Sequence, residues 1–149
     1  MAPPVTDLEV IQRLLLAAAV GGVIGAEREV RRKSAGFRTN ILIAMGAAVF
    51  TMMSISIAAD WGGDSTRIAA QIVTGIGFLG AGAIIRTGRD VHGLTTAATV
   101  WVNAALGIAV GAGAYHIAII AGAITLIVLL ILGPIEVAFE RWVERRQPR

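Results

Sequence analysis

The fold is decided by the stretch VHGLTTAATVWVNAALGIAVGAGAYHIAIIAGAITLIVLLILGPI, residues 91–135, which holds 45 consecutive residues without Asp, Glu, Lys or Arg. A helix needs about 20 mostly apolar residues to cross the roughly 30 Å hydrocarbon layer of a membrane. The stretch is therefore long enough for two spans joined by a tight turn. Working outward, residues 39–59 and 68–85 form further charge-free stretches of 21 and 18 residues. The sequence predicts a membrane protein.

The composition of the whole chain agrees with this prediction. Of 149 residues, 56% are hydrophobic and 15% are charged, and the mean hydropathy is +0.74. Soluble domains average about a quarter charged residues. The net charge of +3 does not indicate a nucleic-acid partner, because the basic residues lie beside the ends of apolar stretches, where the lipid bilayer is the expected partner. The absence of cysteine excludes disulfides, thiolate nucleophiles and zinc–thiolate sites.

We expect an all-α membrane protein, a bundle of five transmembrane helices, because lipid offers backbone groups no hydrogen-bond partners. The expected spans are residues 10–26, 39–59, 68–85, 94–112 and 115–135. The first is expected to be a retained helix, since charged residues and no cleavage site follow it. Eleven of the thirteen Lys and Arg residues follow the first, third and fifth spans, so the positive-inside rule predicts an amino terminus outside and a cytoplasmic carboxyl terminus. The chain is expected to form one transmembrane domain, residues 1–149, with residues 136–149 as a basic cytoplasmic helical tail.

Glycines are concentrated in the third expected span. Gly75 to Gly80 form a GxGxxG pattern, but this pattern lies inside an apolar span and not between a strand and a helix, so we reject a dinucleotide site. Small residues four apart let membrane helices pack closely, which places the third span at the centre of the bundle. The same spacing recurs in two pairs, Gly21 with Gly25 and Gly107 with Gly111. A flexible gate is the alternative use of these glycines.

Polar residues at membrane depth and charged residues in the loops are the candidate functional groups. Gln71, Thr74 and Asn103 either form interhelical hydrogen bonds or line a solute pathway. Five further polar or charged residues are expected to meet at one membrane face: Arg28, Arg38, Thr39, Asn40 and Arg86. Thr39 or Asn40 is expected to cap the second span, and Thr95 or Thr96 the fourth.

Three carboxylates at this face, Glu27, Glu29 and Asp90, could offer oxygen ligands to Mg²⁺. The alternative is a set of salt bridges from Glu27 or Asp90 to Arg38 or Arg86. No catalytic triad, HExxH motif or P-loop occurs, and the two histidines are expected at opposite faces, so we do not expect an enzyme. No cofactor is expected apart from Mg²⁺.

Four blocks of sequence together resemble the MgtC/SapB family of bacterial inner-membrane proteins. They are GGVIGAERE (residues 21–29), AGFRTNILI (residues 35–43), GIGFLGAGAII (residues 75–85) and VHGLTTAATVW (residues 91–101). The motif residues that this resemblance implies are Glu27, Arg28, Gly36, Arg38, Thr39, Gly75, Gly77, Gly80, Gly82, Gly93, Leu94, Thr95, Thr96 and Trp101. The resemblance implies a helical inner-membrane protein associated with growth under magnesium limitation and, in pathogens, with survival inside phagocytes.

The chain departs from better-known family members in two ways. They carry a cytoplasmic carboxyl-terminal domain, which we do not expect in this chain, and some virulence-associated members have Asn where this chain has Thr95 and Cys where it has Val102. Two functional hypotheses follow from the resemblance and the residues. The first is a non-enzymatic protein of magnesium homeostasis that contacts another membrane complex, such as the ATP synthase. The alternative is a homo-oligomeric transporter of Mg²⁺ or a small solute, with Gln71, Thr74 and Asn103 along its route and Glu27 and Asp90 at its inner mouth.

Overall fold

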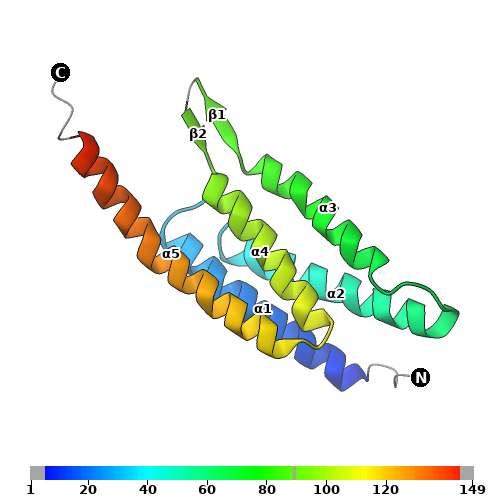
Figure 1. Ribbon diagram of the computed structural model, residues 1–149. Helices are drawn as coiled ribbons and strands as arrows, with labels where there is room; N and C mark the ends of the chain where they lie inside the picture. Colours follow the sequence, from blue (N-terminus) through cyan, green and yellow to red (C-terminus); the bar gives the residue numbers. More distant parts are fainter. Residues whose placement is uncertain (1–5, 89, 145–149) are drawn as a thin grey trace.

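The described part of the chain forms a bundle of five helices with one short hairpin (Figure 1). The structure, a computed structural model, describes residues 6–88 and 90–144. The elements follow in the order α1 (Asp7–Val30), α2 (Phe37–Trp61), α3 (Arg67–Gly82), β1 (Ile85–Thr87), β2 (Asp90–His92), α4 (Leu94–Gly111) and α5 (Tyr115–Glu144). The predicted all-α membrane bundle is confirmed.

Four of the helices are long and apolar enough to cross a membrane: α1, α2, α4 and residues Tyr115–Gly133 of α5. Helix α3 has 16 residues, which at 1.5 Å per residue gives a length of about 24 Å. It is therefore shorter than a bilayer core of roughly 30 Å. The crossing of the membrane by α3 and the orientation of the termini stay predictions. Helix α5 continues beyond the fifth expected span to Glu144, and residues 145–149 of the expected tail lie outside the described residues.

The loops with most of the basic residues gather at one end of the bundle. Figure 1 shows the α1–α2 loop, the β1–β2 hairpin and the carboxyl end of α5 at this end, and the start of α1 and the α2–α3 loop at the other. We call the first end the hairpin end; it contains residues 31–36, 83–88 and 90–93. The structure thus brings the loops after the first and third expected spans to the same end, as the sequence predicts.

Helices α1, α2 and α4 form the tightly packed core of the bundle. Ala17, Ala44 and Val110, one from each of these helices, are fully buried in one cluster. Glycines let the backbones approach: a Cβ added at Gly21 would lie 2.6 Å from the carbonyl oxygen of Asn40, and one at Gly111 would lie 2.6 Å from that of Ala48. The close contacts predicted from the two glycine pairs are confirmed.

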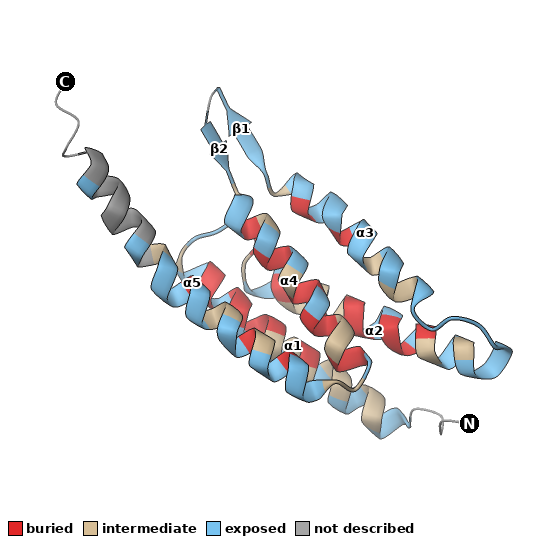
Figure 2. Cartoon of the chain, viewed as in Figure 1, coloured by how far each residue is buried: buried red, intermediate tan, exposed pale blue. Residues whose placement is uncertain are grey.

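The prediction that the third span lies at the centre is wrong. Figure 2 shows α3 as a largely exposed helix, and its buried residues are Ile76 and Gly80. The central helix is α4, which packs against each of the other four. The sequence pattern misleads here because three glycines of α3, Gly75, Gly77 and Gly82, have no atom of another element close enough to pack against.

The ends of α2 and α3 and the capping of α2 and α4 also differ from the sequence prediction, whereas α4 begins at Leu94 as expected. Helix α3 ends at Gly82, and the following residues pair as an antiparallel hairpin with Arg86 opposite Val91. Helix α4 begins after Gly93, whose φ of +88° favours glycine, and a Cβ there would collide with the carbonyl of Ala83. Helix α2 begins after Gly36. Neither α2 nor α4 has a side-chain cap, so the predicted capping by threonine or asparagine is wrong.

Candidate functional site

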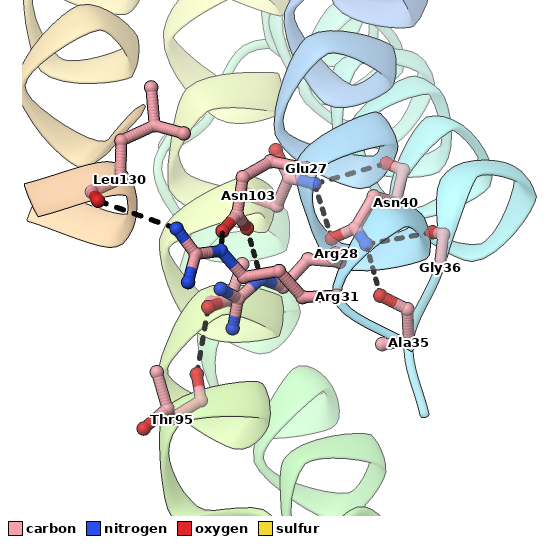
Figure 3. A network of polar contacts seen from close by, with 10 residues as sticks. Glu27, Arg28, Arg31, Ala35, Gly36, Asn40, Thr95, Asn103 and Leu130 are labelled. Carbon is pink, nitrogen blue, oxygen red and sulfur yellow. Dashed lines mark hydrogen bonds and ion pairs between the residues drawn. The ribbon is translucent and has the colours of Figure 1, made fainter. Parts of the chain in front are cut away.

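A network of buried polar groups lies where α1, α2 and α4 meet toward the hairpin end (Figure 3). Its first part joins α2 to α4. The Nδ2 group of Asn103 donates to Oδ1 of Asn40 at 2.7 Å and to the backbone carbonyl of Asn40 at 3.3 Å. Both side chains are fully buried. The interhelical hydrogen bond predicted for Asn103 is confirmed.

Asn40 in turn holds the loop that precedes its own helix. Its Nδ2 group donates to the carbonyl oxygens of Ala35 and Gly36, both at 2.8 Å. These bonds tie the end of the α1–α2 loop to the first turn of α2. One buried amide therefore links the loop, α2 and α4.

The second part of the network is an ion-pair cluster on α1. Oε2 of Glu27 lies 2.5 Å from Nε of Arg28, and Oε1 lies 2.5 Å from Nε of Arg31. Glu27 is 8% exposed and Arg28 is 3% exposed. Salt bridges are therefore present, but the predicted partners, Arg38 and Arg86, are wrong. Two guanidinium groups share one carboxylate, so the cluster carries a formal net charge of +1.

The cluster also reaches α5. Nη2 of Arg31 donates to the backbone carbonyl of Leu130 at 3.3 Å, as Figure 3 shows. Among the described residues, Nη1 of Arg28 has no hydrogen-bond partner although it is buried. An unsatisfied donor beside a surplus positive charge favours an anion or a water over a cation.

The three proposed carboxylate ligands of Mg²⁺ are not brought together. Glu27 lies between the two arginines, while Oε2 of Glu29 accepts a hydrogen bond of 3.0 Å from the backbone N–H of Phe37 at the start of α2. A Cβ at Gly36 would collide with this Glu29 carboxylate, which gives that motif glycine a physical role. Asp90 is exposed in the hairpin. Within residues 6–88 and 90–144, no group of three or more acidic or histidine side chains could hold a metal ion.

The remaining predicted residues divide into buried and exposed sets. Thr96 is buried on α4, and Gly80 packs against Ala97. Thr74 donates to the carbonyl of Ala70 within its own helix, and Arg86 donates to the carbonyl of Gly88 within the hairpin. The exposed predicted residues are Glu29, Arg38, Thr39, Gln71, Thr74, Gly75, Gly77, Gly82, Arg86, Asp90, Leu94, Thr95 and Trp101.

Arg31 and Thr99 belong to the buried network although the sequence reasoning did not select them. Arg31 follows Glu27 by four residues, the favourable order for a helical ion pair, so this spacing was a usable signal. The hydroxyl of the buried Thr99 donates to the carbonyl of Thr95 at 2.7 Å. Nothing in the sequence distinguishes Thr99 from the other threonines of this helix.

Comparison with known proteins agrees with the motif residues now placed in the structure. The family model described as the MgtC family matches residues 14–138. The chain belongs to the MgtC family. Protein MgtC of Salmonella typhimurium (strain LT2) is 50% identical over 122 residues, which are 82% of this chain and 52% of that protein. YhiD of Escherichia coli (strain K12), whose name proposes a magnesium transporter, is 49% identical over 127 residues, which are 81% of this chain and 59% of YhiD.

The match to MgtC relatives extends to other bacteria. Protein MgtC of Brucella abortus (strain 2308) is 46% identical over 130 residues, or 87% of this chain and 54% of that protein. The chain spans about half the length of the curated relatives it matches. No solved structure matches it. The family resemblance found in the sequence is confirmed.

Proposed function

We propose that this MgtC-family chain is a non-enzymatic membrane protein of magnesium homeostasis that lies in the bacterial inner membrane and acts by contacting another membrane complex. The link to magnesium comes from the family and from the name of the relative YhiD. A multi-pass membrane location is supported by the four long apolar helices. The mode of action is argued from the structure.

The observation that carries the proposal is that Asn40, Asn103 and Glu27 each bind other groups of the chain, although Nη1 of Arg28 has no partner among the described residues. Asn103 binds Asn40, and Glu27 is held by Arg28 and Arg31. The glycines of α1 and α4 bring the backbones of these two helices into contact with that of α2. The groups available to a partner are therefore the exposed motif residues, such as Trp101 and Thr95 on α4.

As the partner we propose the proton-translocating ATP synthase, which the family resemblance implies. The test is co-purification of the tagged full chain from bacterial membranes, together with ATP-driven proton pumping in inverted vesicles. We expect the chain to retain ATP synthase subunits and to reduce pumping. Trp101 is 52% exposed on α4, so Trp101→Ala should weaken both effects, whereas Trp61→Ala, at a residue 86% exposed on α2, should not. Normal pumping and normal ATP levels in low Mg²⁺ would contradict the proposal.

The second candidate function is a transporter built as an oligomer, and Gln71 is the observation that favours it. Its amide is exposed on the apolar helix α3, where a polar group gains from a partner in another subunit. Against it, Asn103 lies in the core and is bonded to Asn40, so it does not share a route with Gln71. Liposomes containing the purified chain and an internal Mg²⁺ indicator decide between the two: we expect no influx above protein-free liposomes, and saturable influx would establish transport.

A further inference from the structure

An apolar groove separates α2 from α3 and has α4 as its floor. Its volume is about 880 Å³. Leu42 and Phe50 of α2 line one wall, Ile72 and Leu79 of α3 line the other, and Val100 lies in the floor. In Figure 1, α3 stands apart from α2 except near their connecting loop.

The space between the two walls of the groove is open where glycines line it. Gly46 and Gly75 line it from opposite sides, and a Cβ added at either would meet no atom within 4 Å. This contrasts with the core, where glycines are pressed against the neighbouring backbone. In a membrane such a groove is filled by hydrocarbon, because nothing polar is offered along most of its length.

The groove is long enough to hold a lipid acyl chain. Residues from Ile68 to Ala83 line it, and at 1.5 Å per residue these positions extend over about 22 Å. One leaflet accounts for about half of a hydrocarbon layer of roughly 30 Å. A chain that enters at one end therefore fits within the groove.

The end of the groove toward the α1–α2 loop has a polar lining, and basic residues lie close to that lining in the sequence. Ser34 and Thr39 line it there. Lys33 and Arg38 adjoin these two residues in the sequence, Arg86 follows the lining residue Ala83 by three positions, and all three basic side chains are exposed. None of them forms an ion pair among the side chains that the structure describes.

Glu29 and Asp90 are the exposed carboxylates described at this end, and they are outnumbered by the three exposed basic side chains. Glu29 already binds the backbone of Phe37, and the first turn of α2 contains no acidic residue and has no side-chain cap. A helix amino terminus in this condition adds to the attraction for an anion. Basic sites between transmembrane helices bind anionic lipid headgroups.

We propose that this groove binds an anionic phospholipid, with its acyl chains between α2 and α3 and its phosphate against Lys33, Arg38 and Arg86. The basic residues at the mouth match the phosphate of such a lipid, and the apolar walls match its acyl chains. A second copy of the chain would match the walls but would need to present an acidic group at the mouth.

The test is native mass spectrometry of the purified full chain, titrated with phosphatidylglycerol and, separately, with phosphatidylcholine of the same acyl chains. We expect phosphatidylglycerol to bind roughly tenfold more tightly. The double variant Arg38→Gln and Arg86→Gln should lose this preference. Arg67→Gln, which removes an exposed charge from the start of α3 at the other end of the groove, should keep it. Equal binding of the two lipids by the unmodified chain would overturn the proposal.

A second pair of variants tests the walls of the groove. Gly75→Leu fills the groove, whereas Gly77→Leu adds the same side chain at a glycine of α3 that does not line it. Neither added Cβ meets an atom within 4 Å, so both variants should fold, with unchanged melting by circular dichroism. We expect Gly75→Leu to reduce the bound lipid several-fold and Gly77→Leu to leave it unchanged. Equal lipid binding by the two variants, or a dimer lost only in Gly75→Leu with no lipid bound, would overturn the proposal.

Discussion

Two glycine-rich regions of the molecule use glycine in opposite ways. In the core of α1, α2 and α4, Gly21 and Gly111 bring backbones so close that a Cβ would collide with a carbonyl oxygen. In the arm formed by α3 and the hairpin, Gly75 and Gly77 face open space. The same residue therefore marks a sealed interface in one region and an unfilled surface in the other. The difference depends on whether another helix lies opposite the glycine, and the local sequence does not show this.

The largest expected effect comes from removing the buried charge of the core. Glu27→Gln leaves Arg28, which is 3% exposed, without its counter-ion. Breaking a buried ion pair by removing one partner costs about 3–5 kcal/mol. We expect a large fall in the melting temperature of the detergent-purified chain. Asp90→Asn, the matched change in the arm, should have almost no effect because Asp90 is exposed. Equal melting temperatures of the two variants would contradict the distinction between core and arm.

A pair of glycine substitutions tests the same comparison by size instead of charge. Gly107→Ala forces a Cβ against the backbone carbonyl of Ala44, whereas Gly77→Ala places it in open space. Overpacking costs about 1–3 kcal/mol, and alanine is the better helix former. We therefore expect Gly107→Ala to lower the unfolding temperature and Gly77→Ala to leave it unchanged or slightly raised. The reverse order would show that α3 is the packed helix.

The buried amide pair gives a similar or smaller effect. Asn103→Leu removes the donor to Oδ1 of Asn40 and leaves that oxygen buried without its 2.7 Å partner. An unsatisfied buried acceptor costs about 1–3 kcal/mol. Gln71→Leu is the control, because this amide is exposed beside an apolar groove. We expect Asn103→Leu to unfold at a lower temperature than Gln71→Leu. An unchanged unfolding temperature of Asn103→Leu would show that the amide pair does not stabilise the fold.

Much of the fold could be predicted from the sequence, because the length of the charge-free stretches and the positions of the charged residues indicate membrane helices and their loops. The charge-free stretches locate the helices, and the basic loops meet at one end of the bundle as expected. The position of α3 could not be predicted. Its small residues satisfy the same spacing rule as Gly107 and Gly111, and only the three-dimensional arrangement shows which glycines have a helix opposite them.

The sequence predicted the residues of the candidate site better than it predicted the contacts between them. Glu27, Arg28, Asn40 and Asn103 were selected, and all four are buried together. The predicted partners of Glu27, Arg38 and Arg86, were wrong because the sequence does not show which residues outside α1 lie beside Glu27, whereas Arg31 lies one helical turn away. The hairpin was missed because residues 83–85 continue the apolar character of α3, and the turn at Gly88 leaves only a short polar signal.

The smallest expected effect lies in the loop that connects the core to the arm. The hydroxyl and the backbone N–H of Thr66 both donate to Asp64, and these hydrogen bonds lower the pKa of the Asp64 carboxyl. A lowered folded-state pKa means that the ionised carboxylate stabilises the loop above its ordinary pKa and that this contribution is lost as the pH falls through the lowered value. Asp64→Asn should therefore remove a slight pH dependence of the melting temperature below about pH 4. An identical pH profile in both proteins would show that these bonds do not affect stability.

The central claim is that the α1–α2 loop and the hairpin lie on one side of the membrane and the α2–α3 loop on the other. Because the chain has no cysteine, it can be tested with single-cysteine variants and a membrane-impermeant maleimide. The positions are Lys33, Thr87 and Ser65, which are all exposed. In spheroplasts we predict labelling of Ser65→Cys alone, with Lys33→Cys and Thr87→Cys labelled only after the cells are opened. Labelling of Lys33→Cys and Thr87→Cys from opposite sides would contradict the account.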